Sequence, residues 1–388
     1  MRYLARLACA LLIFLCACAA SGDDAARPWR EIGKLPSRSI PLPERQAYYD
    51  LAWLEDDVLV LVNNPTKNGP NLGGDLWAMT LDEFSLSRLP LPLDVKGCTV
   101  TDYAAPTALP DGRLGYTKWC ALGPTGDKHW VEARDLQTGA TEVLVGPTPD
   151  SPGAPSWNPS MTRAIVGMGS YICGGLLWLT PDGRELPGIV VRDEGATWRV
   201  DEYFRVEDIK CDVEGQADWP AWSPDGERIA FFGMPPTPGQ GGFSRLDRPW
   251  SLFIMDSRRL QPRKVLEGIV GPHVLAWSPD NRWLTFGGEI SGIRAIWLFS
   301  PDDRVLYRLT TFKEWFAWAP NGRALATLHD VGLGFPDAPH DAELRIFYVG
   351  PALDKLGRGR TPISTGRAVV SRCGEGKCSH ATARRTRS

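Results

Sequence analysis

The chain has 388 residues and a formal net charge of −3, so it is long enough for one large domain and lacks the strongly basic balance of a nucleic-acid-binding protein. Its hydrophobic fraction of 43% is typical of a globular protein with a core. Sixteen Trp, 33 Pro and 40 Gly indicate short strands joined by tight turns, and argue against long helices.

The first residues predict an export signal. Arg2 and Arg6 precede an apolar run over residues 7–17, which is too short to span a bilayer and is typical of the core of a secretory signal peptide. We therefore assign residues 1–17 to a signal peptide. The mature protein is expected outside the cytoplasm.

Two endings of this signal remain open. Leu15-Cys16-Ala17-Cys18 resembles the bacterial lipobox, and the resemblance implies a lipidated Cys18, with residues 18–40 as lipid attachment and tether. Ala17-Cys18-Ala19 alternatively offers an ordinary cleavage site. The first ending predicts a lipoprotein anchored to a membrane of the bacterial envelope. The second predicts a soluble periplasmic or secreted protein.

A repeated motif organises the rest of the chain. Its clearest copy is Trp222-Ser223-Pro224-Asp225-Gly226, followed by the apolar strand Ile229-Ala230-Phe231-Phe232. Pro fixes φ at the start of a tight turn, and Asp-Gly tolerates the positive φ that such a turn needs. Three clear and three weaker copies begin at Trp53, Ala108, Trp157, Trp222, Trp277 and Trp318.

Each copy continues with a third strand that is rich in aromatic and aliphatic residues. These strands are expected at 76–79, 130–133, 177–180, 252–255, 296–299 and 346–349. A fourth strand follows, as at 142–145 and 305–309. One small sheet cannot bury both of its faces, whereas sheets arranged radially bury each other. The pattern therefore predicts an all-β, six-bladed β-propeller of four-stranded antiparallel blades over residues 41–370. Either 41–47 or 367–370 would complete the last blade.

Trp-Ser-Pro-Asp-Gly followed by an Ile-Ala-Phe-like strand resembles the repeat of TolB-like propellers, which the prolyl-oligopeptidase and dipeptidyl-peptidase propellers also carry. The resemblance covers roughly residues 45–365 and implies the same propeller fold. TolB itself carries an α/β domain before its propeller, and only a short segment precedes the first repeat here. The partner-binding role of TolB therefore does not follow from the resemblance.

The cysteines suggest how the loops are joined. Six of them follow the signal region, an even number that allows three disulfides in an oxidising compartment. In a propeller, the loops between second and third strands share one face with the crossovers between blades, and we call this the long-loop face. Free or metal-bound thiols are the alternative. The predicted bridges are Cys98–Cys120, Cys173–Cys211 and, by exclusion, Cys373–Cys378.

The long-loop face is the predicted binding surface because the long insertions gather there and loops on a rigid scaffold usually carry function. These insertions are 63–75, 190–219, 233–250 and 329–341. We expect exposed aromatic and charged side chains on this face. They are Trp198, Tyr203, Phe243, Arg245, Asp247, Arg248 and Trp250.

No catalytic or phosphate-binding motif accompanies the repeats. The chain has no Gly-x-Ser-x-Gly elbow, no His-Glu-x-x-His and no phosphate-binding glycine loop. We therefore expect a monomeric, non-catalytic scaffold without a cofactor or metal, which binds a protein or peptide partner. A propeller hydrolase or lyase is the alternative. Residues 371–388 are expected to form a basic, solvated tail.

Overall fold

The computed structural model is all-β in its described part, apart from the helix α2 (Gly350–Arg358). No helix in this part of the chain has the length and hydropathy needed to cross a membrane. The described residues are 28–43, 47–64, 74–92, 95–122, 126–148, 153–169, 174–180, 188–193, 196–200, 216–235, 248–311, 315–330 and 342–358.

Each of the first two repeats forms a separate four-stranded antiparallel sheet. The first sheet comprises β3 (Ala47–Glu55), β4 (Val58–Asn64), β5 (Asp75–Thr80) and β6 (Ser85–Arg88). The second sheet comprises β7 (Val100–Ala108), β8 (Leu114–Ala121), β9 (Asp127–Arg134) and β10 (Thr141–Thr148). Each third strand coincides with the aromatic-apolar segment that the sequence predicts.

The third repeat forms a three-stranded sheet and a neighbouring hairpin. The sheet contains β11 (Ser156–Trp157), β12 (Ala164–Gly169) and β13 (Gly174–Leu179). The hairpin contains β14 (Val190–Asp193) and β15 (Ala196–Arg199). The Leu176 amide of β13 donates to the Val200 carbonyl at 2.6 Å, so the hairpin continues the outer edge of this sheet.

The fourth and fifth repeats share one eight-stranded sheet, where two separate sheets were expected. Its strands are β16 (Gln216–Trp222), β17 (Arg228–Met234), β18 (Pro249–Asp256), β19 (Arg263–Trp277), β20 (Leu284–Ile290), β21 (Ile293–Ser300), β22 (Val305–Thr310) and β1 (Arg30–Glu31). The long strand β19 pairs with β18 over 263–270 and with β20 over 270–277. The strand β1 adds to β22 in parallel, which differs from the purely antiparallel pairing expected.

The last repeat is completed by the N-terminal side of the chain. Its sheet contains β23 (Trp315–Trp318), β24 (Ala324–Asp330), β25 (Ala342–Tyr348) and β2 (Ser37–Pro41). Antiparallel pairing of β2 runs from Ser37 opposite Phe347 to Pro41 opposite Glu343. The expected closing segment at 41–47 is therefore displaced toward the N-terminus, and 367–370 lies outside the described residues. The assignment of 30–31 and 37–40 to a tether is wrong, because both segments pair with sheet edges.

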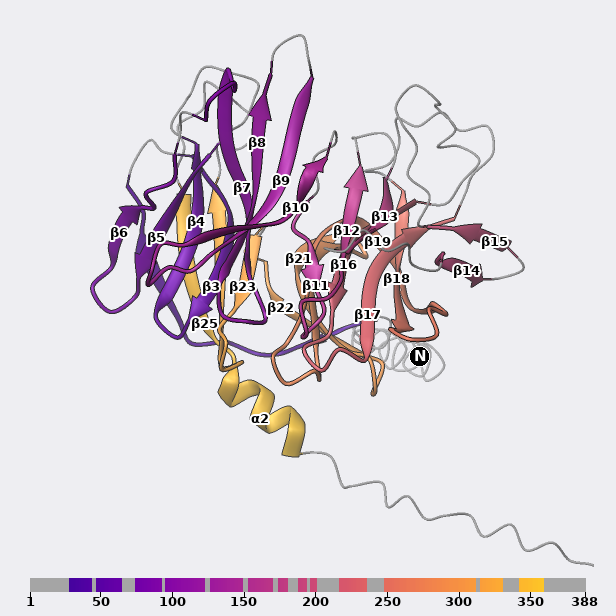
Figure 1. The fold of residues 1–388 in the computed structure, drawn as a ribbon. Coiled ribbons are helices and arrows are strands. Elements are labelled where there is room, and N and C mark those ends of the chain that lie inside the picture. Colours follow the sequence, from indigo (N-terminus) through magenta and orange to yellow (C-terminus); the bar gives the residue numbers. More distant parts are fainter. Residues whose placement is uncertain are drawn as a thin grey trace, which may run out of the picture.

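The sheets adopt a propeller-like arrangement. Each repeat contributes its first strand to the inside of the molecule, and these strands contact one another: β3 with β7, β11 with β16, β16 with β19, and β19 with β23. The strand β23 in turn contacts β3, so the orange C-terminal strands lie beside the indigo N-terminal ones in Figure 1. The contacts run from β11 through β16, β19, β23 and β3 to β7, and we call the line around which these strands are arranged the axis.

The repeated Trp residues are core residues in all five repeats that have one. They are between 5% and 8% exposed, as expected for large plates between neighbouring sheets. The indole N–H of Trp277 donates to the Ala221 carbonyl of the preceding repeat at 3.1 Å. The guanidinium of Arg228 lies 4.3 Å from the Trp277 ring centroid. The five anchors are Trp53, Trp157, Trp222, Trp277 and Trp318.

Hydrogen bonds from residues of the repeated motif close the turn that follows each anchor Trp. The Ser223 amide donates to the Arg228 carbonyl at 2.8 Å, and the Ser278 amide donates to the Trp283 carbonyl at the same distance. The Ser223 hydroxyl also donates to the Asp225 carboxylate at 2.6 Å. Each Asp therefore caps its own turn, which supports the structural interpretation of these aspartates over a catalytic one.

Candidate functional site

Strained backbone marks one position on the first strands. The residue three before the anchor has positive φ in four repeats: Asp50 (58°), Ala105 (52°), Trp219 (51°) and Val274 (43°). Each lies at a register shift of its strand, so all four are β-bulges. Positive φ is unfavourable for residues other than glycine, especially for β-branched and bulky ones, and bulges re-aim side chains. The strain therefore sits at one level of the axis.

Side chains at this level keep partial exposure while their neighbours are buried. Asp50 is partly exposed, whereas Leu51 and Trp53 on the same strand are 4% and 5% exposed. Trp219 and Trp315 are also partly exposed. Their ring centroids are 6.1 Å apart, with an interplanar angle of 63°. Because β16 belongs to the eight-stranded sheet and β23 to the sheet of the last repeat, the two rings form a contact between different sheets.

Asp50, at this level of the first strands, has a carboxyl group with a shifted pKa. Burial raises its pKa from 3.8 to about 7, although the Leu51 amide, which donates to its Oδ1 atom at 2.8 Å, favours the charged form. Asp50 therefore ionises near neutral pH. We call Asp50, Trp219 and Trp315 the axial cluster.

Two more polar side chains flank the bulges. Asp218 precedes Trp219 and accepts the Trp219 amide on Oδ1 at 2.8 Å. His273 precedes Val274, and its Nδ1 atom lies 3.3 Å from the Gly271 carbonyl. Two glycines leave room for these side chains. A Cβ atom at Gly167 would lie 2.1 Å from Asp218 Oδ1, and one at Gly287 would lie 2.2 Å from His273 Nε2.

A second perturbed acid lies between the first and second sheets. The pKa of Asp102 on β7 is raised to about 6 by burial and by the negative charge of Asp75 on β5. Arg88 holds Asp75 with two contacts, Nη2 to Oδ1 at 3.0 Å and Nε to Oδ2 at 2.9 Å. Among the described residues, no group of three His, Cys, Asp or Glu side chains has the geometry of a metal site.

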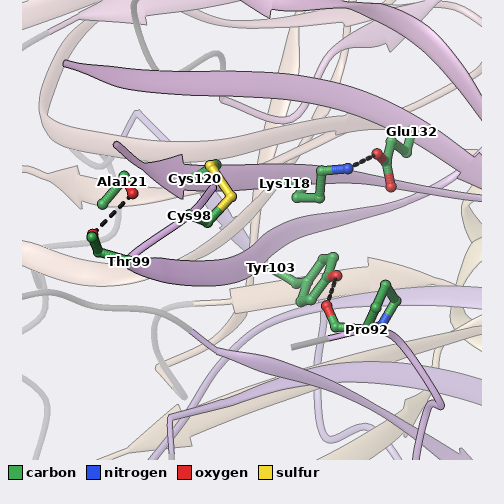
Figure 2. Close-up of a disulfide and its surroundings, with 8 residues drawn as sticks. All are labelled: Pro92, Cys98, Thr99, Tyr103, Lys118, Cys120, Ala121 and Glu132. Atoms are coloured by element: carbon green, nitrogen blue, oxygen red, sulfur yellow. Dashed lines mark hydrogen bonds and ion pairs between the residues drawn. A yellow bond between two sulfur atoms is a disulfide. The ribbon is translucent and has the colours of Figure 1, made fainter. Parts of the chain in front are cut away.

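Figure 2 shows how the second sheet is fixed at its loop end. Cys98 and Cys120 form a disulfide, with 5.3 Å between their Cα atoms. The amide and the hydroxyl of Thr99 both donate to the Ala121 carbonyl, at 2.7 and 2.9 Å. The predicted Cys98–Cys120 bridge is therefore confirmed.

The same sheet buries a polar network beside the disulfide (Figure 2). Glu132 accepts hydrogen bonds from the Lys118 ammonium and, at 2.9 Å, from the Tyr116 hydroxyl. The Tyr103 hydroxyl donates to the Pro92 carbonyl. These partners are all internal, so the network stabilises the sheet.

The structure corrects part of the predicted binding surface. Trp198 lies on β15 and Trp250 on β18, and they are 5% and 3% exposed within the core. The expectation that these two side chains are exposed is wrong, because both indoles pack inside the sheets. Arg248 is partly exposed, and its guanidinium donates to the Pro235 carbonyl at 3.5 Å.

Several predicted residues lie outside the described part of the chain, so their roles stay predictions. They are Cys18, Cys173, Tyr203, Cys211, Phe243, Arg245, Asp247, Cys373 and Cys378. The axial cluster, in contrast, was not among the predicted site residues. Its signal in the sequence is positional: Asp50, Trp219 and Trp315 stand three residues before Trp53, Trp222 and Trp318.

Comparison with known proteins gives distant similarities. No family model matches the chain. An uncharacterized protein of Agrobacterium fabrum is 24% identical over 132 residues, which cover 33% of this chain and 41% of that protein.

Solved structures similar to the chain include three propeller-containing proteins. TolB from Acinetobacter baumannii has a TM-score of 0.48 and 13% identity, covering 75% of this chain and 63% of that one. Oligogalacturonate lyase from Vibrio parahaemolyticus has a TM-score of 0.45 and 12% identity, covering 82% and 97%. Acylaminoacyl peptidase from Pyrococcus horikoshii has a TM-score of 0.44 and 15% identity, covering 80% and 54%. The chain spans less than two thirds of the A. fabrum protein and of the A. baumannii TolB.

Proposed function

We propose that this chain is a six-bladed propeller that binds a protein or peptide partner in the bacterial envelope without catalysing a reaction. The observation that carries the binding role is the contact between the two partly exposed indoles of the axial cluster, together with the strained, partly exposed Asp50 at the equivalent position of another first strand. Exposed aromatic side chains on a rigid scaffold supply contact area at a low entropic cost.

The proposed count of six blades is supported by the long strand β19, which changes its pairing partner along its length. The strand β19 serves as the fourth strand of one blade over 263–270 and as the first strand of the next over 270–277. The eight-stranded sheet then counts as two blades, with β1 as an additional strand. The hairpin β14–β15 supplies the outer part of the third blade, and β2 supplies the fourth strand of the last.

The location in the envelope rests on the cysteines and on the N-terminal sequence. A disulfide between Cys98 and Cys120 persists in an oxidising compartment and is rare in the cytosol of mesophiles. Lipidation of Cys18 is tested by mass spectrometry of the mature N-terminus, compared with a Cys18→Ser variant. A lipid-modified Cys18 in the wild type supports the anchor. A mature chain that begins at another residue shows ordinary cleavage.

The binding role is tested by photo-crosslinking in cells. p-Benzoylphenylalanine is placed at position 219 of the axial cluster, and at position 348 as a matched control, because Tyr348 is 42% exposed at the end of β25. We expect a discrete adduct from position 219 only. Equal adducts from both positions, or no adduct from position 219, would contradict a partner site at the axis.

A propeller hydrolase or lyase is the second candidate, favoured by one observation. A carboxyl group whose pKa is about 7 has the proton affinity of a general acid or base at neutral pH. A panel of ester and saccharide substrates tests it with the Asp50→Asn variant. Turnover that Asp50→Asn abolishes would establish the enzyme. Turnover at the blank rate in the wild type supports the binding role.

A further inference from the structure

The strand β1 adds to a part of the eight-stranded sheet that is complete without it. The fifth repeat has its four strands in the second half of β19 and in β20, β21 and β22. Beyond them, β1 pairs with the outer edge of β22, with Arg30 opposite Tyr307 and Glu31 opposite Arg308. In the described part of the chain, the sheets of the first two repeats stop at four strands. The outer edge of β22 therefore holds an extended segment that the repeat itself does not require.

Trp29 anchors this segment in the core. Its side chain is 5% exposed and belongs to the buried cluster that also contains Ile269 of β19 and Trp297 of β21. The ring centroids of Trp29 and Trp297 are 5.6 Å apart, with an interplanar angle of 62°. An extended segment that adds to a sheet edge gains affinity from its backbone and specificity from the places of its side chains. The edge of β22 therefore selects an aromatic residue at this position.

Arg308 contacts two side chains of the segment at once. Its guanidinium carbon lies 4.9 Å from the Trp29 ring centroid. Its Nη2 atom donates to one carboxylate oxygen of Glu31, and its Nε atom donates to the other at 3.2 Å. Residues two positions apart in an extended strand point to the same face, so one arginine can meet both. The contacts define a pattern, an aromatic residue followed two positions later by an acidic one.

The segment uses only part of the edge that β22 offers. The strand β22 runs from Val305 to Thr310, and β1 pairs with two of its residues. The next amide, that of Ile32, reaches the Arg308 carbonyl at 3.4 Å, and parallel pairing is slightly less stable per residue than antiparallel pairing. The strand β2 pairs with the last sheet through five residues of its own, so the closure of that sheet does not depend on β1. A longer segment would gain backbone hydrogen bonds that β1 does not make.

We propose that the outer edge of β22 is a binding site for an extended segment of a protein partner that carries an aromatic residue and, two positions later, an acidic one. The partner segment adds to β22 in parallel, and residues 29–31 of the chain fill the site when the partner is absent. The site is separate from the axial cluster, so the inference goes beyond the proposed function.

The test uses the full mature chain as the receptor. The probe is a labelled pentapeptide, Pro-Trp-Arg-Glu-Ile, which is the sequence of residues 28–32. Trp29→Ala in the receptor empties the aromatic position and leaves β2 unchanged. Fluorescence anisotropy should show saturable binding of the peptide to Trp29→Ala. Binding to the wild type should be at least about 10-fold weaker, because its own segment competes at an effective concentration in the millimolar range.

Variants of the peptide and of the receptor test the pattern. Replacing Trp with Ala in the peptide should weaken binding at least about 100-fold, as expected for a large buried aromatic side chain. Replacing its Glu with Gln should weaken binding about 2- to 5-fold, since Glu31 and Arg308 are both partly exposed in their ion pair. Arg308→Ala, added to the Trp29→Ala receptor, should weaken binding about 3- to 30-fold. Arg294→Ala, at an exposed position of β21, is the matched control and should change nothing.

Circular dichroism shows whether each receptor is folded. If Trp29→Ala fails to fold, Glu31→Lys serves as the second receptor, because it opposes the charge of Arg308 and leaves Trp29 in place. The peptide should then bind Glu31→Lys more tightly than it binds the wild type, and equal affinity would contradict the inference.

Four other outcomes would overturn the inference. They are no binding to a folded Trp29→Ala receptor, equal binding to that receptor and to the wild type, equal binding of the peptide that lacks Trp, and unchanged affinity in Arg308→Ala. A wild-type dimer in light scattering that Trp29→Ala abolishes would assign the site to a second copy of the chain and overturn its assignment to a partner. None of these results affects the photo-crosslinking at position 219, so a failure of this site and a failure of the proposed function are distinguishable.

Discussion

Replacing Asp50 with Asn should stabilise the folded protein at neutral and alkaline pH. Burial raises the pKa of Asp50 from 3.8 to about 7 in the folded protein. Between these two values the unfolded chain has released a proton that the folded state still holds. Stability therefore falls as the pH rises from about 4 to 7, and the contribution of Asp50 is fully present only below that window.

The magnitude follows from the same pKa change. At about 1.4 kcal/mol for each tenfold change in the ionisation constant, a rise from 3.8 to about 7 corresponds to about 4 kcal/mol as an upper bound. Partial exposure of the side chain reduces this, so we expect about 2–4 kcal/mol. Asn keeps the shape, can accept the Leu51 amide and tolerates the φ of 58°. Asp50→Asn should therefore gain this free energy at pH 8 and nothing at pH 4.

The assay is urea unfolding followed by circular dichroism at pH 4, 6 and 8, with the disulfide intact. The difference in unfolding free energy between Asp50→Asn and wild type should grow across this series. Asp82→Asn, at an exposed turn, should show no such trend. An Asp50→Asn protein that is no more stable than wild type at pH 8 would refute the reasoning about burial.

Three further changes test the scaffold. The Cys98→Ser, Cys120→Ser pair opens a loop with a sequence separation of 22 and should cost about 3 kcal/mol in urea unfolding; a loss below about 1 kcal/mol would mean that the loop is held by other contacts. Gly287→Ala should lower the melting temperature, because its Cβ would lie 2.2 Å from His273 Nε2; an unchanged value would show that the imidazole moves aside freely. Ile40→Asp on β2, where Ile40 is 1% exposed, should cost at least about 3 kcal/mol by burying an unpaired charge, and a smaller loss would mean that β2 does not close the last sheet.

The local elements could be predicted because their causes are local. A Trp that ends a strand and a Pro-Asp-Gly or Pro-Asn-Gly turn fix the first hairpin of a repeat through neighbouring residues. The Ser223 amide, for instance, bonds to the Arg228 carbonyl within that hairpin at 2.8 Å. The third strands follow from runs of aromatic and aliphatic residues, as at β21, where five consecutive residues from Ala295 to Phe299 are at most 2% exposed.

The pairing between distant segments could not be predicted from such patterns. The strand β2 is a five-residue segment with one buried side chain, so its hydrophobic pattern is weak, and its place is set by the free edge of β25. The partial merging of two sheets depends on β19 continuing through residue 270, although Gly271-Pro272, a pair that usually predicts a turn, follows directly inside the strand. Trp198 and Trp250 were placed in loops because the insertion boundaries were drawn too wide.

The bulges at Asp50 and Trp219 were missed because their signal lies in backbone conformation. The residue types of Ala105 and Val274 do not predict a left-handed backbone conformation. The residue type of Trp219, taken by itself, predicts a core residue. The bulge becomes visible only when the φ angles of equivalent positions are compared, since Asp50, Ala105, Trp219 and Val274 then fall on one level.

The contrast between turns and bulges shows which strained residues the proposed binding role has to explain. Four of the five proline turns place Gly or Asn at positive φ, namely Gly112, Gly226, Asn281 and Gly322. There the chain uses the residues for which this conformation is cheap. At the axis it places Trp and Val in the same region, at a cost of order 1–3 kcal/mol each, together with an aspartate whose ionisation opposes folding at neutral pH. A backbone selected for stability alone would carry Gly or Asn at these bulges too. Side chains held there against that cost are therefore the ones on which the proposed binding role is best tested.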